Sequence, residues 1–372
     1  MVHCSFTSVN IKEQDFSASS AQFWNPMSDV CVATDQALEL SSVAESRVPP
    51  EPFPQRRLGI VGCGYILRDV YSPILKSVSK DARIVAVCDI NETAAHEAAN
   101  SLDASEVYLE PKRFFEKADI DGVLVLTKEI ANAQIAAMAL AQGINVYLEK
   151  PPAVSLPELR SLIAAESRSE AVVYTAFNRR HTPLFKRMPD LDARITRVSG
   201  TLKRTGREEE SFPYTAIHIV DSAQHFVQSE LMEAEVKCKR DTCGLTWTIE
   251  GRFGNGAACL LTASPNASIH EEYLIIESDR SRRRLHFPHP LDHFPGGAIF
   301  SESFDLEAGS ELFGQPSSKT FVMGYSDCLF EFLRALRENT LKYSPHRLSR
   351  ALASVSVMQK MFAANGAILD LA

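Results

Sequence analysis

Between Arg57 and Glu149 the chain alternates short apolar runs with stretches of helical character, and this pattern constrains the fold more than any other feature. The apolar runs read RLGIVGCG, RIVAVCDI, GVLVLT and NVYLE. A helical stretch through Lys76, the alanine-rich NETAAHEAANSL and a helix over 130–142 separate them. Strands that are apolar on both faces and are separated by helices predict a parallel sheet covered by helices on both sides.

After Val173 the pattern changes to alternation of polar and apolar residues. The segments RITRVSGTLKRT, EAEVKCKRD, LTWTIEGRF, AACLLTAS and EYLIIES have the two-residue period of half-exposed antiparallel strands. Amphipathic helices are predicted near 325–338 and over 347–364. The predicted fold class is therefore α/β, a Rossmann-type parallel sheet domain followed by an α+β domain with an open, mainly antiparallel sheet. We expect an N-terminal extension and linker over 1–56, a dinucleotide-binding domain over 57–175 and a substrate-binding and oligomerisation domain over 176–372.

Charge and composition exclude several classes of protein. The 372 residues carry a formal net charge of -8 without a long basic tract, so we expect no nucleic-acid partner. No apolar run is long enough to span a bilayer, and the N-terminus lacks the basic and apolar regions of a secretion signal. The eight cysteines are scattered without paired CxxC units. We therefore expect a reduced, cytoplasmic protein with no membrane partner and no metal site.

A Gly-x-Gly pair, Gly62 and Gly64, lies between the first strand and the first helix. Glycines here let the backbone approach a pyrophosphate, which the start of the helix then stabilises. The third glycine position of this fingerprint holds Leu67, so the motif is incomplete. The second strand ends in Asp89, whose carboxylate can accept hydrogen bonds from an adenosine ribose and would repel a 2′-phosphate. NAD is therefore favoured over NADP, although turn glycines and a strand-end aspartate without a ligand would give the same pattern.

A helix that opens near Pro213 carries Tyr214, His218, Asp221 and His225 on one face. This face offers proton-transfer groups, with a carboxylate near enough to orient an imidazole. A polar face packed at a domain boundary, or a solvated one, remains the alternative from the pattern alone.

Taken together, these motifs resemble the Gfo/Idh/MocA oxidoreductase family over roughly residues 57–364. The resemblance rests on the glycine loop, the strand-end aspartate, a threonine loop after a later strand, an EKP motif, Asn-x-Arg and His-x-x-Asp. In this chain these are Gly62 and Gly64, Asp89, Thr127, Glu149-Lys150-Pro151, Asn178 and Arg180, and His218 and Asp221. The segments FNRRHTPLF and IHIVDSAQHF are most similar to the MviM, or virulence-factor-like, branch.

The resemblance implies that Lys150 projects from the carboxyl edge of its strand beside the nicotinamide and polarises or protonates the substrate oxygen. Burial beside a cationic nicotinamide would disfavour the charged form of this lysine. The implied catalytic residues are Lys150, His218 and Tyr214. The implied cofactor-binding residues are Gly62, Gly64, Tyr65, Ile66, Asp89, Thr127, Glu149, Lys150, Asn178 and Arg180. The implied substrate-binding residues are Lys150, Arg180, Tyr214, His218 and Asp221.

The chain departs from the family pattern at three places. Tyr214 stands where family members commonly have an aspartate, and a tyrosine cannot act as a carboxylate at neutral pH. The family's Thr-Pro-Asn loop reads Thr127-Lys128-Glu129, which places two charges near the expected cofactor edge. The family's later histidine is Asn132.

Two further clusters have simpler interpretations. His286, His289 and His293 could bind zinc, but the intervening prolines prevent them from lining one helix face. The arginine-rich run Arg280–Arg284 could hold a phosphorylated substrate, but we interpret it as a solvated turn between two strands.

The expected activity is NAD-dependent hydride transfer between the cofactor and a secondary alcohol or ketone of a sugar, cyclitol or related polar metabolite, with an imine also possible. Two alternatives remain open, a redox-neutral enzyme with tightly bound NAD and a non-catalytic NAD-binding regulatory or scaffold protein. The resemblance also implies a homodimer or homotetramer formed through the exposed sheet face.

Overall fold

The computed structural model describes residues 55–78, 80–187, 194–241, 244–288, 298–303, 309–312 and 323–366. The chain divides into the units Met1–Glu51 and Pro52–Ala372, and every described residue belongs to the second. The predicted extension over 1–56 therefore lies almost wholly outside the described residues.

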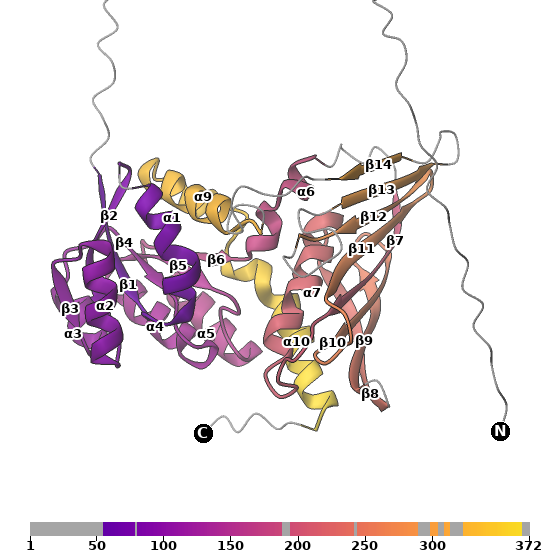
Figure 1. Ribbon diagram of the computed structural model, residues 1–372, viewed down its shortest axis with the longest axis horizontal. Helices are drawn as coiled ribbons and strands as arrows, with labels where there is room; N and C mark the ends of the chain where they lie inside the picture. Colours follow the sequence, from indigo (N-terminus) through magenta and orange to yellow (C-terminus); the bar gives the residue numbers. More distant parts are fainter. Residues whose placement is uncertain are drawn as a thin grey trace, which may run out of the picture. The chain divides into compact units, whose positions relative to one another are not determined.

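The first sheet has six strands in the order β3-β2-β1-β4-β5-β6, and every pairing is parallel (Figure 1). Its strands are β1 (Arg56–Val61), β2 (Ala82–Cys88), β3 (Glu106–Tyr108), β4 (Gly122–Val125), β5 (Asn145–Glu149) and β6 (Val173–Ala176). The four central strands are buried on both faces, which explains their continuous apolar character. This confirms the predicted Rossmann-type sheet.

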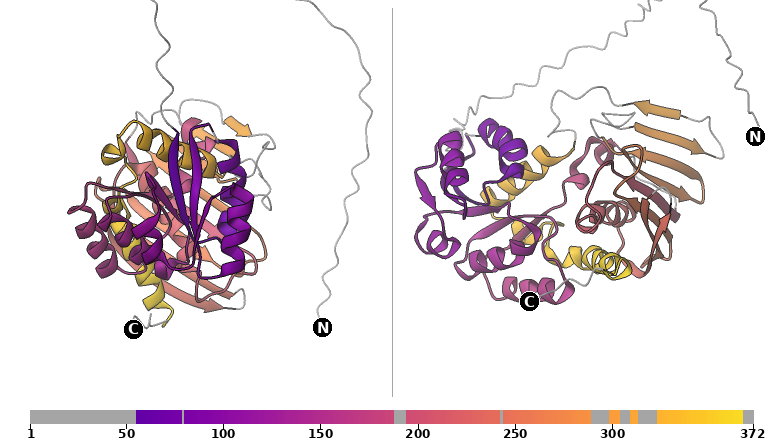
Figure 2. Two further views of the ribbon diagram at one scale, coloured as in Figure 1. Left: turned by 90° about the vertical axis from the view of Figure 1, so that its left-hand side faces the viewer. Right: turned by 60° about the horizontal axis from the view of Figure 1, so that its bottom comes forward.

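Helices cover both faces of the first sheet. One face packs against η1 (Leu67–Tyr71), α1 (Ser72–Ser77), α2 (Glu92–Leu102) and α9 (Tyr325–Arg337). The other packs against α3 (Pro111–Lys117), α4 (Glu129–Ala141), α5 (Leu156–Glu166), η4 (Leu348–Ala351) and α10 (Leu352–Ala364). The late helix α9 thus completes the core of the early sheet, as two views show (Figure 2). The predicted domain boundary between 175 and 176 stays a prediction.

The second sheet has eight strands in the order β14-β13-β12-β11-β7-β10-β9-β8. Among the described pairings of this second sheet, only β7–β10 is parallel, which confirms the mainly antiparallel sheet. Its strands are β7 (Ile195–Lys203), β8 (Leu231–Asp241), β9 (Gly244–Phe253), β10 (Ala258–Ser264), β11 (Glu271–Ser278), β12 (Ser281–His286), β13 (Ala298–Ser303) and β14 (Gly309–Leu312). Two short elements, η2 (Asn178–His181) and α6 (Pro183–Arg187), join the two sheets, and η3 (Leu341–Tyr343) follows α9.

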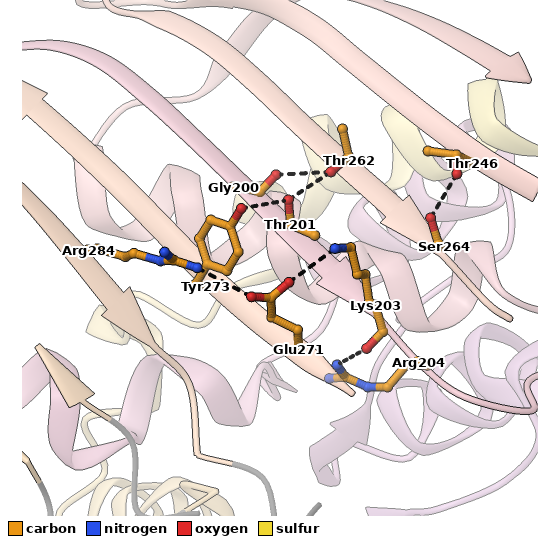
Figure 3. A network of polar contacts seen from close by, with 10 residues as sticks. All are labelled: Gly200, Thr201, Lys203, Arg204, Thr246, Thr262, Ser264, Glu271, Tyr273 and Arg284. Carbon is orange, nitrogen blue, oxygen red and sulfur yellow. Dashed lines mark hydrogen bonds and ion pairs between the residues drawn. The ribbon is translucent and has the colours of Figure 1, made fainter. Parts of the chain in front are cut away.

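The two faces of the second sheet differ in character. The inner face packs its apolar residues against α7 (Pro213–Val227) and α10, where the indole nitrogen of Trp247 donates to the carbonyl oxygen of Met361 at 2.9 Å. The outer face carries a polar network (Figure 3). There Thr201 contacts Thr262 and Tyr273, and Glu271 pairs with Lys203 and Arg284.

One interpretation of the sequence is wrong. The run Arg280–Arg284 is not simply a turn, because β12 begins at Ser281 and takes up most of it. Arg284 pairs with Glu271 and covers the ring of Tyr273 at 4.0 Å, so strand pairing accounts for this arginine. Within the described ranges, every helix is too short or too polar to cross a membrane.

Candidate active site

The EKP segment lies where β5 ends, at the carboxyl edge of the first sheet. Glu149 is the last residue of the strand, and Lys150 comes directly after it. The peptide bond between Lys150 and Pro151 is cis. The Lys150 side chain is half-buried, and its Nζ donates to the carbonyl oxygen of Tyr214 at 3.3 Å. A residue at the edge of the first sheet is therefore held against the first turn of α7.

Burial lowers the pKa of Lys150 from its ordinary value. The carboxylates of Glu149 and Glu129 act in the opposite direction, whereas the positive charges of Arg179 and Arg207 lower the pKa further. A lysine in this setting gives up its proton more easily than a solvated one, as an acid/base group near neutral pH requires.

Glu149 is nearly inaccessible to solvent and lies beneath Lys150. The hydroxyl of Tyr71 donates to its Oε1 at 2.5 Å, and the backbone N–H of Lys150 donates to Oε2 at 3.0 Å. Burial raises the pKa of Glu149, against the effect of Lys150 and Tyr71. The phenol of Tyr71 also lies 3.1 Å from that of Tyr147, so a buried polar cluster fixes this carboxyl.

Asn132 braces two loops at the same edge. Its side-chain amide donates to the carbonyl oxygens of Glu149 at 3.0 Å and Pro151 at 2.9 Å, and its Oδ1 accepts from the Thr127 hydroxyl at 2.8 Å. The side chain is 1% exposed, so each of these bonds replaces water that cannot reach it. The asparagine that departs from the family pattern therefore holds the Thr127 loop to the EKP segment.

The glycine loop and Asp89 meet at the carboxyl ends of β1 and β2. Gly62 has φ +97°, and a Cβ there would lie 2.6 Å from the carbonyl oxygen of Leu126, so only glycine fits. A Cβ on Gly64 would meet nothing within 4 Å. The Asp89 carboxylate accepts the backbone N–H groups of Cys63 at 2.7 Å and Asn91 at 2.8 Å.

These features fit a dinucleotide. The space above Gly64 gives a phosphate room to approach the backbone, and the Asp89 oxygens keep acceptor capacity for ribose hydroxyls. Tyr65 is 62% exposed at the start of the helical segment, beside the half-buried Ile66. Leu67, at the position of the missing third glycine, is 1% exposed and packs in the core beneath the loop.

His218 lies on α7, one helical turn beyond Tyr214, and is 4% exposed. Burial lowers its pKa well below the ordinary value, and the charges of Arg179, Lys150 and Arg204 lower it further. Its imidazole is therefore neutral at neutral pH. The buried Nδ1 atom has no hydrogen-bond partner within the part of the chain that the structure describes.

The ring of Tyr214 packs against α10. It lies edge-on against Phe362 at 4.9 Å, and burial raises the pKa of Tyr214, as do the charges of Glu129 and Glu158. The backbone carbonyl of Tyr214, rather than its hydroxyl, contacts Lys150. A proton-relay role for the phenol stays a prediction.

Arg180 and Asp221, both predicted at the site, are paired with each other. Arg180 donates Nε to Oδ2 at 2.9 Å and Nη2 to Oδ1 at 2.5 Å, and both side chains are buried. Nearby, the Asn178 amide donates to the carbonyl oxygen of Met323 at 2.7 Å, just before α9. In this arrangement the three residues tie η2 to α7 and α9.

The sequence did not single out Arg179, Arg204 and Glu272, which form a buried ion network beside His218. Arg179 donates to both Glu272 oxygens at 3.2 and 3.0 Å, and Arg204 donates to Oε2 of the same carboxylate. Burial would raise the pKa of Glu272, but the two guanidiniums hold it at about 2. A signal was present, because Glu272 shares the inward register of Leu274 and Ile276 in β11, where a carboxylate needs a partner.

The histidine cluster considered for zinc is only partly described. His286 is buried in β12 with its ring 5.5 Å from that of Tyr273, whereas His289 and His293 lie outside the described residues. Elsewhere, ligand atoms of His181, Glu331 and His346 lie within 4.8 Å of one another. The two imidazoles are stacked at 4.7 Å, so their in-plane lone pairs do not converge on one ion.

Residues 56–177 match the model of the GFO_IDH_MocA family, described as an oxidoreductase family with an NAD-binding Rossmann fold. The myo-inositol 2-dehydrogenase of Thermotoga maritima is 25% identical over 134 residues, which cover 36% of this chain and 40% of that protein. The match therefore spans less than half the length of this curated relative. The match to the family model confirms the family resemblance and the NAD-binding fold for residues 56–177.

Solved structures extend the likeness to the second sheet. A Gfo/Idh/MocA family oxidoreductase from Vibrio cholerae has a TM-score of 0.69 at 17% identity and covers 84% of this chain and 98% of that chain. A dehydrogenase (MviM) from Clostridium difficile has a TM-score of 0.70 at 15% identity and covers 83% of this chain and 99% of that chain. At these identities the likeness shows the fold.

Proposed function

We propose that this chain, whose residues 56–177 belong to the Gfo/Idh/MocA oxidoreductase family, is an NAD-dependent dehydrogenase acting on a secondary alcohol or ketone of a sugar or cyclitol. One observation carries the proposal. Lys150 follows the last residue of β5 at the carboxyl edge of the nucleotide-binding sheet, and its Nζ contacts the first turn of the helix that bears His218. Ligands bind at this edge of such sheets.

NAD would be held by the glycine loop and Asp89, and when bound it accepts or supplies the hydride. Oxidation of a carbinol also requires loss of the hydroxyl proton, which needs a base within hydrogen-bond reach. Lys150 is the group proposed for this step, because burial and nearby arginines favour its neutral form. His218, a buried neutral imidazole, is proposed to orient the substrate hydroxyl and assist the proton transfer.

Substrate turnover is the experiment that tests this proposal. The purified full-length chain is incubated with NAD and a panel of inositols, aldoses, uronic acids and nucleotide sugars, and NADH absorbance is followed. We expect NADH to form with at least one of them. Conversion without net NADH would support the redox-neutral alternative, and NAD binding without conversion of any compound would support a non-catalytic protein.

The cellular setting and assembly form a second part of the proposal. We expect a cytoplasmic homodimer or homotetramer that associates through the outer face of the second sheet, where Thr201, Thr262, Tyr273 and the Lys203–Glu271–Arg284 pairs lie (Figure 3). A sheet face whose polar side chains already form hydrogen bonds and ion pairs with one another suits an interface with a polar rim. Light scattering after size exclusion tests it, and a monomer at micromolar concentration would contradict it.

A further inference from the structure

Positive charge exceeds negative charge on the His218 side of Lys150. Arg179 and Arg204 are buried, 6% and 3% exposed, and share the single carboxylate of Glu272. Two guanidiniums against one carboxylate leave one net positive charge in a region nearly inaccessible to water. An uncompensated buried charge is costly, so such an arrangement favours binding of an anion.

Three carboxylates near Lys150 and His218 are engaged elsewhere. Asp221 is paired bidentately with Arg180. Glu149 accepts from the Tyr71 hydroxyl and the Lys150 backbone, on the side of the nucleotide-binding sheet. Glu129 opens α4 at the same edge and acts on Lys150 from there. Neither Asp221 nor Glu149 is therefore free to balance the arginines beside His218.

Arg207 adds a cation that no described residue neutralises. It lies in the loop between β7 and α7, three residues after Arg204, and its backbone N–H donates to the carbonyl oxygen of Pro265 at 3.1 Å. Its side chain is exposed, and within the described ranges its guanidinium makes no hydrogen bond or ion pair. Its charge nevertheless acts on Lys150, Arg204 and His270, so its guanidinium lies within electrostatic reach of all three.

The unpartnered Nδ1 atom of His218 lies in the same region. The guanidiniums of Arg179 and Arg204 act on His218, and the protonated form of Lys150 acts on it in the same direction. A substrate that brought an anionic group here would offset this excess. Guanidinium groups also match the two oxygens of a carboxylate or phosphate geometrically, which a neutral sugar hydroxyl does not.

Resting on the function proposed above, the geometry points to a substrate that carries an anionic group, a carboxylate or a phosphate, bound by the guanidinium of Arg207 beside the Arg179–Glu272–Arg204 network. The reacting hydroxyl then lies toward Lys150, and the anion sets the orientation of the ring. Arg207 acts on substrate choice, since binding energy remote from the reacting carbon positions that carbon.

Three matched probes test this inference on the full chain, with NAD present and absent. D-glucose is neutral, D-glucuronate differs from it by a carboxylate, and glucose 6-phosphate differs by a phosphate. Calorimetric titration is expected to show at least one anionic probe binding about tenfold or more tighter than glucose, as a charge-assisted hydrogen bond provides. Which anion binds distinguishes the carboxylate from the phosphate.

Arg207→Gln is expected to lower that preference about tenfold while NAD affinity is unchanged. Arg160→Gln, which removes an exposed arginine of α5, serves as the matched control and is expected to keep the parent preference. The inference is overturned if neither anionic probe binds, if glucose binds as tightly, or if Arg207→Gln keeps the preference. It is also overturned if Arg207→Gln weakens NAD instead, because Arg207 would then serve the cofactor.

The inference and the proposed function fail separately. NAD binding and NADH formation from neutral alcohols, with no preference for anions, leave the dehydrogenase standing and overturn the anion site. An anion preference that depends on Arg207 in a protein that does not bind NAD supports the anion site and overturns the dehydrogenase.

Discussion

The Nζ atom of Lys150 lies 3.3 Å from the backbone carbonyl oxygen of Tyr214, so a main-chain atom of α7 holds the lysine that ends the EKP turn. This contact survives replacement of the side chain at position 214. The departure from the family's aspartate therefore leaves the placement of Lys150 intact, and the Tyr214 ring is free to pack against Phe362.

Tyr214→Phe is expected to keep turnover within about a factor of 3 of the parent, whereas His218→Asn is expected to lower it by about 10²–10⁴. Phenylalanine retains the ring contact with Phe362 and the carbonyl contact with Lys150. Steady-state rates of both variants, with NAD affinity as the control, check this. Equal losses in the two variants would instead assign the phenol a direct part in proton transfer.

Asn132→Leu is expected to lower the free energy of unfolding by about 2–4 kcal/mol. The leucine leaves the Thr127 hydroxyl and the carbonyl oxygens of Glu149 and Pro151 without their hydrogen-bond partner. Urea unfolding measures the loss. Ala137→Leu, on the same helix but half-buried and without a polar partner to lose, controls for added bulk. An unchanged midpoint in Asn132→Leu would show that the brace contributes nothing to stability.

Asp89→Asn is expected to narrow the preference for NAD over NADP, because the amide removes the negative charge that repels a 2′-phosphate. The amide oxygen can still accept one of the backbone N–H groups of Cys63 and Asn91, so the loop is disturbed less than by alanine. Calorimetric titration of both cofactors measures the ratio. Tighter binding of NADP by the unaltered protein would rule out this role of Asp89.

Stability is expected to fall as the pH drops below neutrality. Burial lowers the pKa of His218 and His346 well below the ordinary value, and that of His225 and His270 to about 4. Because the folded pKa lies below the unfolded one, the unfolded chain binds these protons first. The stability is fully present above about pH 6.5 and is lost progressively toward about pH 4.

Thermal melts across this pH range check the expectation. His225→Asn is expected to make the melting temperature depend less on pH, because the variant lacks one imidazole whose pKa is lowered by folding. A melting temperature that stays constant from about pH 7 to about pH 4 would contradict it.

Most of the fold follows from periodicity in the sequence. Continuous apolar runs indicate the buried parallel strands β1, β2, β4 and β5, and strict alternation indicates β7–β11. The three-residue β3 is too short to show a period, and the consecutive arginines of β12 hide the alternation typical of a strand. The packing of α9 against the first sheet could not be predicted, because an amphipathic stripe does not say which core receives it.

The candidate site was predicted only in part for a related reason. Strand ends identify Asp89 and Lys150, since parallel strands present their carboxyl ends at one edge. Pairing across the chain is invisible in sequence, so neither the Arg180–Asp221 pair nor the Arg179–Glu272–Arg204 network could be predicted. The expected role of Arg180 in binding cofactor and substrate stays a prediction. Arg179 and Arg180 are adjacent in FNRRH, and their sequence context does not distinguish them. The short helix η2 directs their side chains to different partners, Glu272 and Asp221.

Lys150 is proposed to move the proton in an NAD-dependent oxidation, and the NADH-forming rate of Lys150→Ala at saturating NAD measures this role directly. With the best substrate of the parent, we expect the rate to fall by about 10²–10⁴ or more, while NAD affinity stays within about twofold. The fold should persist, because burial already disfavours the charged form of this lysine. A rate near that of the parent, in a protein that binds NAD normally, would contradict the proposed mechanism.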